Sequence, residues 1–137
     1  MGEDLVLMVQ IFNDCKKISY LNQPLYYYYS NTESITGLQS YDNVSKRVMQ
    51  LKENVLLIQK YLSGQGLDIK YKDEITHLKI FTRLESFKCK HDARWQQLWN
   101  SVFSDLKLFD VLINRDVSIK SKTIYLSVEM GIYRIIK

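Results

Sequence analysis

The sequence contains few of the residues that interrupt regular structure. Of its 137 residues, one is proline and five are glycine. So few breakers favour long helices over a sandwich of many short strands. Hydrophobic residues make up 46% of the chain and charged residues 25%, a balance that is typical of a soluble globular domain with a real core.

Cysteine is also scarce. Cys15 and Cys89 are far apart and form no Cys-x-x-Cys or Cys/His ligand set, so we expect no structural zinc site. Two free thiols are typical of an intracellular protein. No stretch reaches the roughly 18 apolar residues of a membrane span. No basic segment precedes the first apolar run, so the sequence predicts no signal peptide and a cytoplasmic location.

The charge balance allows several partners. The formal net charge is +4 and the isoelectric point is near 9.0. This mild basicity fits an anionic surface or ligand, but solubility alone explains it equally well. The lysines are scattered along the chain, so nucleic acid is not an expected partner.

The chain opens on a pair of acids followed by an apolar run. Apolar residues at helical spacing predict a helix over residues 3–14, with Glu3 and Asp4 in its first turn. Acids in this position complement the positive end of the helix dipole. Stabilisation of the first turn is therefore one reading of the pair.

The next segment changes period. Residues 17–29 are rich in β-branched and aromatic side chains and are interrupted by Pro24, which predicts two short strands around a turn. The polar residues 30–41 predict a linker. We therefore expect residues 1–40 and residues 41–137 to form separate regions.

The clearest predicted element is a helix over residues 42–63. Asp42 or Asn43 is its expected N-cap, and Gly64 is its expected C-cap. Spacings of four and three residues place six apolar side chains on one seam. This seam predicts antiparallel packing in a helical bundle, and a homo-oligomeric contact is the alternative. The seam consists of Val44, Val48, Leu51, Val55, Ile58 and Leu62.

Further helices are predicted over residues 73–90 and over residues 92–103, the second capped by Asp92. A short piece, with Ser104-Asp105 as its expected cap, is predicted to run through Ile113. Residues 119–136 fit both periods, and their helical neighbours favour a helix. The expected inward side chains of the first two helices are Ile75, Leu78, Phe81, Leu84 and Phe87, and Trp95, Leu98, Trp99, Val102, Phe103 and Leu106. The sequence therefore predicts a mainly α fold: a short N-terminal helix and a small β-hairpin, followed by a helical bundle.

Several short motifs follow one another near the N-terminus. A Glu-Asp pair heads a helix, Lys-Ile precedes Leu-Asn-x-Pro-Leu-Tyr-x-Tyr, and Ser-Ile-Thr comes soon after. The residues that carry this order are Glu3, Asp4, Lys17, Ile18, Leu21, Asn22, Pro24, Leu25, Tyr26, Tyr28, Ser34, Ile35 and Thr36. The ordered set resembles the C-terminal part of the catalytic domain of family 2 glycosyltransferases. Members often have arginine after the second tyrosine, where this chain has Tyr29, so any role of that cation does not carry over.

The resemblance implies the transfer of a sugar, with inversion, from a nucleotide-diphosphate sugar to an acceptor hydroxyl. Direct in-line attack requires a base that removes the acceptor proton, and a carboxylate at a helix N-terminus suits that task. By the resemblance, Asp4 would be this base, and Glu3 would hold Asp4 or the acceptor in place. Tyr26 and Tyr28 are candidates for stacking on sugar rings, with core packing as the more common role of such residues.

The donor side of such an enzyme is absent from the sequence. Family members bind the nucleotide on an N-terminal βαβ half and hold the diphosphate through a divalent metal, Mg²⁺ or Mn²⁺, on an Asp-x-Asp motif. The chain contains no Asp-x-Asp, no glycine-rich phosphate loop and no βαβ pattern. We therefore expect a fragment that is inactive alone, whose partners are the missing nucleotide-sugar-binding half and a glycan or lipid-linked acceptor.

Other readings remain open. A non-catalytic helical module could use residues 42–113 for oligomerisation, including a homodimer. The basic, amphipathic residues 119–137 could dock on the inner face of a membrane, although closing the bundle is the favoured role. The two tryptophans at helical spacing fit core burial better than a carbohydrate platform. Lys79, Arg83, Lys88 and Lys90 predict a solvated basic face, and neither His77 nor His91 has neighbours in the sequence that suggest chemistry.

Overall fold

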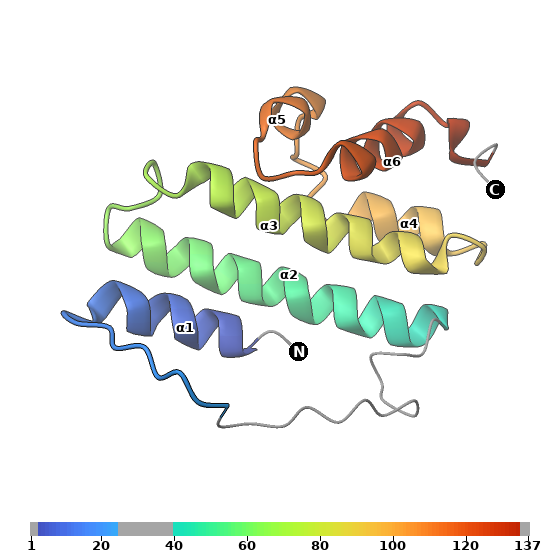
Figure 1. The fold of residues 1–137 in the computed structure, drawn as a ribbon. Helices are drawn as coiled ribbons and strands as arrows, with labels where there is room; N and C mark the ends of the chain where they lie inside the picture. Colours follow the sequence, from blue (N-terminus) through green and yellow to red (C-terminus); the bar gives the residue numbers. More distant parts are fainter. Residues whose placement is uncertain (1–2, 25–39, 135–137) are drawn as a thin grey trace.

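The computed structural model describes residues 3–24 and 40–134, and all regular structure within these ranges is helical (Figure 1). The mainly α prediction and the predicted helical bundle are confirmed. Short 3₁₀ turns follow α3 and α6. The elements are α1 (Glu3–Asp14), α2 (Tyr41–Gly64), α3 (Lys72–Glu85), η1 (Ser86–Cys89), α4 (Trp95–Ser101), α5 (Leu108–Ile113), α6 (Ile119–Glu129) and η2 (Ile132–Arg134).

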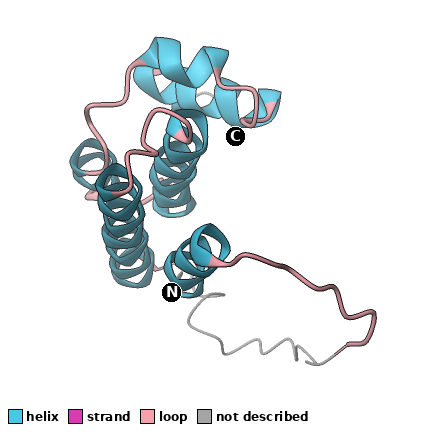
Figure 2. Ribbon diagram, turned by 90° about the vertical axis from the view of Figure 1, so that its left-hand side faces the viewer, coloured by secondary structure: helices cyan, strands magenta, loops and turns pink. Residues whose placement is uncertain are grey.

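The predicted β-hairpin is not seen. The described part of it, residues 17–24, has no strand, and the Ile18 and Tyr20 side chains are 67% and 88% exposed. A strand needs a hydrogen-bonded neighbour and a covered face, and nothing in the described chain covers these residues. Figure 2 shows this stretch leading away from the helices as a loop. The second predicted strand and most of the predicted linker lie outside the described residues.

Helix α2 is the central element, and it lies between α1 and α3 (Figure 1). Its predicted seam is confirmed, because five of the six positions are buried and Leu51 is half-buried. This seam faces the helices that pack on α2, as a 3–4 spacing of apolar residues requires. The buried five are Val44, Val48, Val55, Ile58 and Leu62.

The predicted caps of α2 are wrong. Its N-cap is Ser40, and Gly64 is still helical. The helix ends in a motif in which Gly66 takes a φ of +68°. There the amide of Leu67 donates to the carbonyl of Leu62 at 2.9 Å. Glycine adopts that conformation without a Cβ clash, which is why the turn is placed two residues later than predicted.

Helix α3 differs from the predicted helix over residues 73–90 in length and in its buried face. It ends at Glu85 and continues as η1. Phe81, predicted to point inward, is 51% exposed, whereas Ile80 is 1% exposed. Helix α3 packs on α2 along one side and on α5 and α6 along another. Two buried faces on one helix cannot be recovered from a single apolar stripe.

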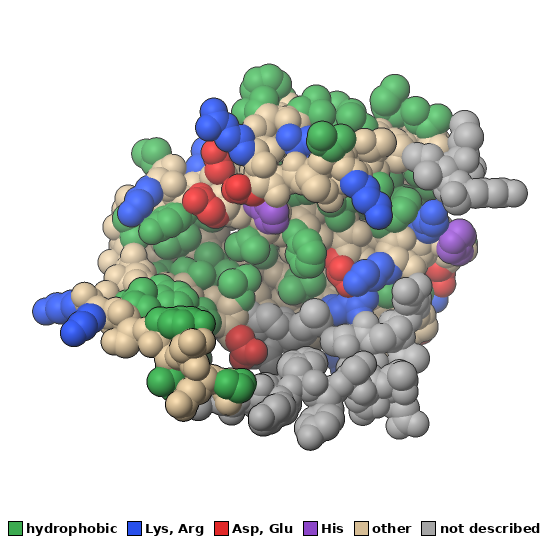
Figure 3. Space-filling view, viewed as in Figure 1, with side chains coloured by type: hydrophobic (Ala, Val, Ile, Leu, Met, Phe, Trp, Pro, Cys, Tyr) green, Lys and Arg blue, Asp and Glu red, His purple; other side chains and the backbone are tan. Residues whose placement is uncertain are grey.

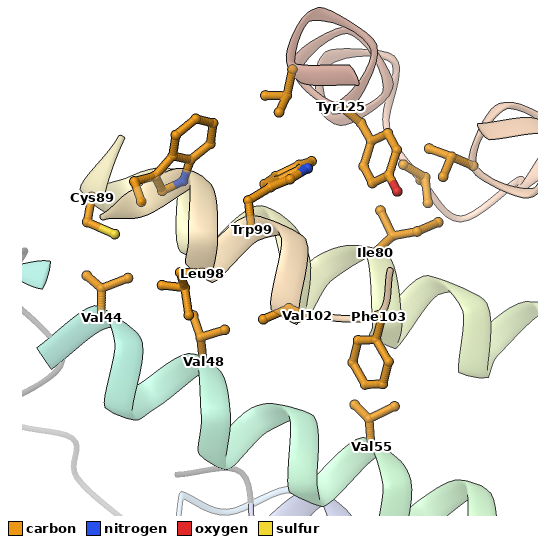
Figure 4. Packing of buried hydrophobic residues seen from close by; sticks show 14 residues of the cluster. Val44, Val48, Val55, Ile80, Cys89, Leu98, Trp99, Val102, Phe103 and Tyr125 are labelled. Carbon is orange, nitrogen blue, oxygen red and sulfur yellow. The ribbon is translucent and has the colours of Figure 1, made fainter. Parts of the chain in front are cut away.

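The outer layer, α4 to α6, closes the main core. The predicted stripe of α4 is confirmed, because its tryptophans, Leu98, Val102 and Phe103 are buried. Figure 4 shows Leu98 above Val48 of α2, and Trp99 beside Tyr125 of α6. The ring centroids of Trp99 and Tyr125 lie 5.4 Å apart. The predicted helix over residues 119–136 ends earlier, at Glu129.

The predicted caps of the outer layer are also wrong. Asp92 does not begin α4, which starts at Trp95. Its carboxylate instead accepts hydrogen bonds from the backbone amide and the guanidinium of Arg94, at 2.9–3.0 Å. The Arg94 side-chain and backbone bonds lower the pKa of Asp92 below its ordinary value. The short piece expected after Ser104 begins at Leu108, with Lys107 as its N-cap.

Candidate functional site

The acid pair lies in the first turn of α1, as predicted. The Asp4 side chain is exposed, and it forms no hydrogen bond or ion pair with another described residue. A hydroxyl group could therefore approach this carboxylate. The side chain of Glu3, and both candidate sugar-stacking residues, Tyr26 and Tyr28, lie outside the description.

Helix α1 is apolar on nearly every side. Seven of its twelve residues are hydrophobic, yet none of them is fully buried. Val6 and Val9 pack against α2 and α3, and the other five are between 40% and 56% exposed. A helix that is hydrophobic all round belongs in a protein interior. The exposed five are Leu5, Leu7, Met8, Ile11 and Phe12.

An apolar groove of about 960 Å³ runs between α1 and α3 over α2. Ile58 and Leu62 form part of its surface on α2, and Leu5, Met8 and Phe12 line it from α1. Figure 3 shows hydrophobic side chains gathered around a hollow on this face. This volume is within the range of pockets that hold small ligands, but the groove is open and formed by three neighbouring helices.

Polar side chains also contribute to this groove. Lys70, Glu74, His77 and Asp116 line it together with the apolar residues. The Nδ1 atom of His77 is buried and has no hydrogen-bond partner in the described chain. Within residues 3–24 and 40–134, no three His, Cys, Asp or Glu side chains are grouped as metal ligands. The groove is therefore mainly a hydrophobic surface with a charged margin.

The C-terminal end of α1 is tied to α2 by side-chain hydrogen bonds. The Tyr61 hydroxyl donates to Asp14 Oδ1 at 2.9 Å and accepts from Asn13 Nδ2 at 3.1 Å. Partial desolvation, and then the bond to Asp14, raise the pKa of Tyr61. These contacts fix the far end of the helix that presents Asp4.

A buried polar cluster was missed by the sequence analysis. Arg83, predicted to lie on a solvated basic face, is 5% exposed. Its guanidinium donates to the Trp99 carbonyl at 3.3 Å and to the Tyr125 hydroxyl, and it pairs with Glu129 at 3.2 Å. The Trp99 indole donates to the same carboxylate at 3.1 Å.

A second buried pair joins Arg47 to Glu85 at 2.9 Å, and Lys88 bonds the same carboxylate at 2.6 Å. Arg83 faces the outer layer and Glu85 faces α2, and the apolar pattern of the sequence marks neither position as buried. In both clusters the charges are compensated by protein partners, so we interpret them as structural.

The described helices include none that is both long and apolar enough to cross a lipid bilayer. Cys15 and Cys89 are free thiols, and burial raises the pKa of Cys89. Comparison with protein-family models, with curated proteins and with solved structures found no match to this chain.

Proposed function

We propose that this chain is the acceptor-side, C-terminal part of an inverting glycosyltransferase of the family 2 type. The observation that carries the proposal is α1 itself. It presents an accessible carboxylate in its first turn, and its remaining surface is apolar on sides that the described residues leave uncovered. Both features fit a helix at the edge of an acceptor cleft that is packed against a further body of protein.

In this proposal Asp4 is the general base. Its carboxylate accepts the proton of the acceptor hydroxyl while that oxygen forms a bond to the anomeric carbon of the donor and the bond to the diphosphate breaks. The exposed position of Asp4 leaves its carboxylate open to the acceptor. Glu3 positions the base or the acceptor, and Tyr26 and Tyr28 contact the sugar. The divalent metal that the resemblance implies would belong to the donor half.

The apolar surface supports a role within a larger assembly. Monomeric proteins rarely expose a contiguous apolar patch larger than a few hundred Å². The exposed side of α1 continues into the groove that borders α3. The nucleotide-binding half of the enzyme would cover this surface and bring the donor opposite Asp4.

The first test is the coding sequence upstream of the codon for Met1. An in-frame βαβ unit with an Asp-x-Asp motif supports the proposal, and a stop codon with a ribosome-binding site contradicts it. In the longer protein, Asp4→Asn should lower kcat by about 10²- to 10⁴-fold and leave donor binding unchanged. Asp68→Asn, an exposed acid in the connection between α2 and α3, is the matched control and should retain full activity. Turnover of a uridine-diphosphate sugar by the 137-residue chain alone would contradict the prediction that activity requires the nucleotide-binding half.

A second candidate function is a non-catalytic module for helix-mediated association. The exposed Met49, Leu56 and Leu57 on α2 favour it, because α2 carries apolar residues outside its buried seam. Light scattering distinguishes the two. A stable dimer that Leu56→Ser dissociates, without an upstream catalytic half, supports the module, whereas a monomer at high concentration argues against it.

A further inference from the structure

Helix α5 presents its apolar side outward. Of its six residues, four are large hydrophobic side chains between 39% and 67% exposed. On the opposite side Val111 is fully buried. A helix on a protein surface normally shows its polar face to water, so this amphipathicity is inverted. We name the four exposed residues the α5 patch: Leu108, Phe109, Leu112 and Ile113.

The α5 patch forms one continuous face of the helix. Leu108 and Leu112 are four residues apart, as are Phe109 and Ile113, and residues at this spacing are neighbours on a helix surface. Helix α5 rests on α3 and α6, at the outside of the bundle. In Figure 3 the side chains over α5 include a hydrophobic group with basic side chains, and acidic ones below these, beside it. The patch lies far along the chain from α1 and its groove, so the acceptor-side proposal does not account for it.

Four cations flank the α5 patch along the chain. Lys107 immediately precedes α5, Arg115 follows it, and Lys120 lies in the first turn of α6. Lys122 lies two residues after Lys120 in α6. None of these four cations forms an ion pair within the described chain. The carboxylates in and beside this stretch are Asp105, which pairs with Lys79 at 3.6 Å, Asp110, which is half-buried, and Asp116, which lines the groove. The first turn of α3, on which α5 packs, adds Asp73 and Glu74.

We propose that the α5 patch and its four cations form a docking surface for an anionic lipid bilayer. Exposed bulky apolar side chains enter the boundary between headgroups and acyl chains, while neighbouring Lys and Arg side chains meet anionic headgroups. An exposed apolar face flanked by four cations that form no ion pair in the described chain matches both halves of that surface. This inference does not rest on the proposed function.

The proposed surface differs from the segment that the sequence suggested as an alternative membrane contact. Residues 119–137 were expected to close the bundle, with membrane docking as the alternative, and in α6 the Tyr125, Ser127 and Val128 side chains are buried against the bundle. Helix α6 therefore closes the core along this side, and it supplies Lys120 and Lys122 as the charged edge of the contact. The hydrophobic anchor is α5.

Vesicle flotation with the full 137-residue chain tests the proposal. The chain should float with phosphatidylcholine vesicles that contain about 30% phosphatidylserine, and binding to vesicles of phosphatidylcholine alone should be roughly tenfold weaker or more. Raising the salt from about 0.1 M to about 0.5 M should lower binding to the anionic vesicles, because the headgroup contacts are exposed to screening.

Two variants test whether vesicle binding depends on the α5 patch or on exposed apolar side chains in general. The double variant Phe109→Ser and Ile113→Ser should lower vesicle binding roughly tenfold or more, because it removes one aromatic and one aliphatic anchor. The matched control is Tyr20→Ser with Ile18→Ser, an aromatic residue and an isoleucine that are more exposed than the patch pair and lie on the segment that leads away from the bundle. It should bind as the unmodified chain does. Circular dichroism should show the same helix content in all three proteins.

A spectroscopic readout locates the contact directly. In a Cys15→Ser background, an environment-sensitive dye on Phe109→Cys should shift to the blue on adding anionic vesicles, whereas a dye on Ile18→Cys should not. The remaining thiol, Cys89, is buried and does not compete for the label. Absence of flotation with anionic vesicles would overturn the proposal, and it is also the result expected if the α5 patch binds a protein instead. Equal loss of binding in the patch and control variants would overturn it as well.

Discussion

The two ends of the bundle are held together to very different extents. At one end, fourteen buried residues from α2 to α6 form a continuous cluster around the two tryptophans. At the other end, the cluster that supports α1 has three fully buried members, Ile58, Leu62 and Ile75. Residues on the open groove belong to this smaller cluster. The bundle is thus dense where it is closed and thin where its surface is apolar.

The difference also extends to polar contacts. In the dense end, Arg83 is held by a backbone carbonyl, a phenol and a carboxylate, and its guanidinium lies 4.7 Å from the Trp99 ring centroid. At the thin end, α1 is joined to α2 by the hydrogen bonds that the Tyr61 hydroxyl forms with Asn13 and Asp14. Buried and fully partnered networks fix one arrangement of a core, whereas a few exposed bonds permit local opening. The comparison predicts that α1 opens without unfolding the rest.

The largest effect is expected from truncating the dense end. Trp95→Ala should lower the free energy of unfolding by about 3–5 kcal/mol, because it leaves a large cavity among well-packed rings. Trp95 is 2% exposed and contacts Phe87, Trp99 and Tyr133 at centroid distances of 4.7–5.8 Å. Urea denaturation followed by circular dichroism measures the change.

Trp95→Phe is the control for that substitution. The Trp95 indole N–H has no hydrogen-bond partner in the described chain, so its loss removes packing only. The expected cost is below about 2 kcal/mol. If Trp95→Ala cost no more than Trp95→Phe, the aromatic cluster would not be the main source of stability.

Two isoleucines of α3 allow a matched comparison of the ends. Ile80, in the dense cluster, is 1% exposed, and Ile75, in the small cluster beside the groove, is 6% exposed. Ile80→Ala should cost about 3–5 kcal/mol and Ile75→Ala about 2 kcal/mol, because a site on an open groove loses fewer contacts and leaves no closed cavity. The same denaturation experiment measures both. Equal costs would contradict the inferred difference in packing.

The buried face of a helix could be predicted from the sequence where the helix has only one such face. The seam of α2 and the stripe of α4 follow from spacing alone, because each helix has a single dominant apolar face. Helix α3 could not be predicted in this way. It has two buried faces, and its buried residues include Thr82, Arg83 and Glu85, whose polarity hides their burial.

The candidate site was predictable in part. The position of Glu3 and Asp4 in a first helical turn follows from local pattern, and the structure agrees. That α1 would be exposed on several sides could not be predicted, because a run of apolar residues indicates burial and not the absence of a covering element. The outward apolar face of α5 could not be predicted for the same reason: the apolar residues of this short helix do not show that Val111 is buried and that Phe109 and Ile113 are exposed.

The smallest effect is a local one at the thin end. Tyr61→Phe removes both side-chain bonds that join α1 to α2 without changing the ring that packs there. Amide hydrogens in the last turns of α1 should exchange roughly two- to tenfold faster, while those of α2 and α4 and the melting temperature should stay unchanged. Hydrogen exchange with mass spectrometry resolves the two regions. A uniform increase over the whole chain would show that α1 unfolds only with the core.

The pH dependence of this contact has a definite sign. The neutral Tyr61 hydroxyl donates to Asp14, and its pKa lies above the ordinary value of 10.0 because partial desolvation and this bond favour the protonated form. Its contribution is therefore complete below pH 10 and is lost as the pH rises through the raised value. The difference between the ultraviolet titrations of the unmodified chain and of Tyr61→Phe isolates this phenol. A midpoint at or below 10 would mean that the hydroxyl does not hold α1 in solution, and α1 would then be retained on the bundle by Val6 and Val9 alone.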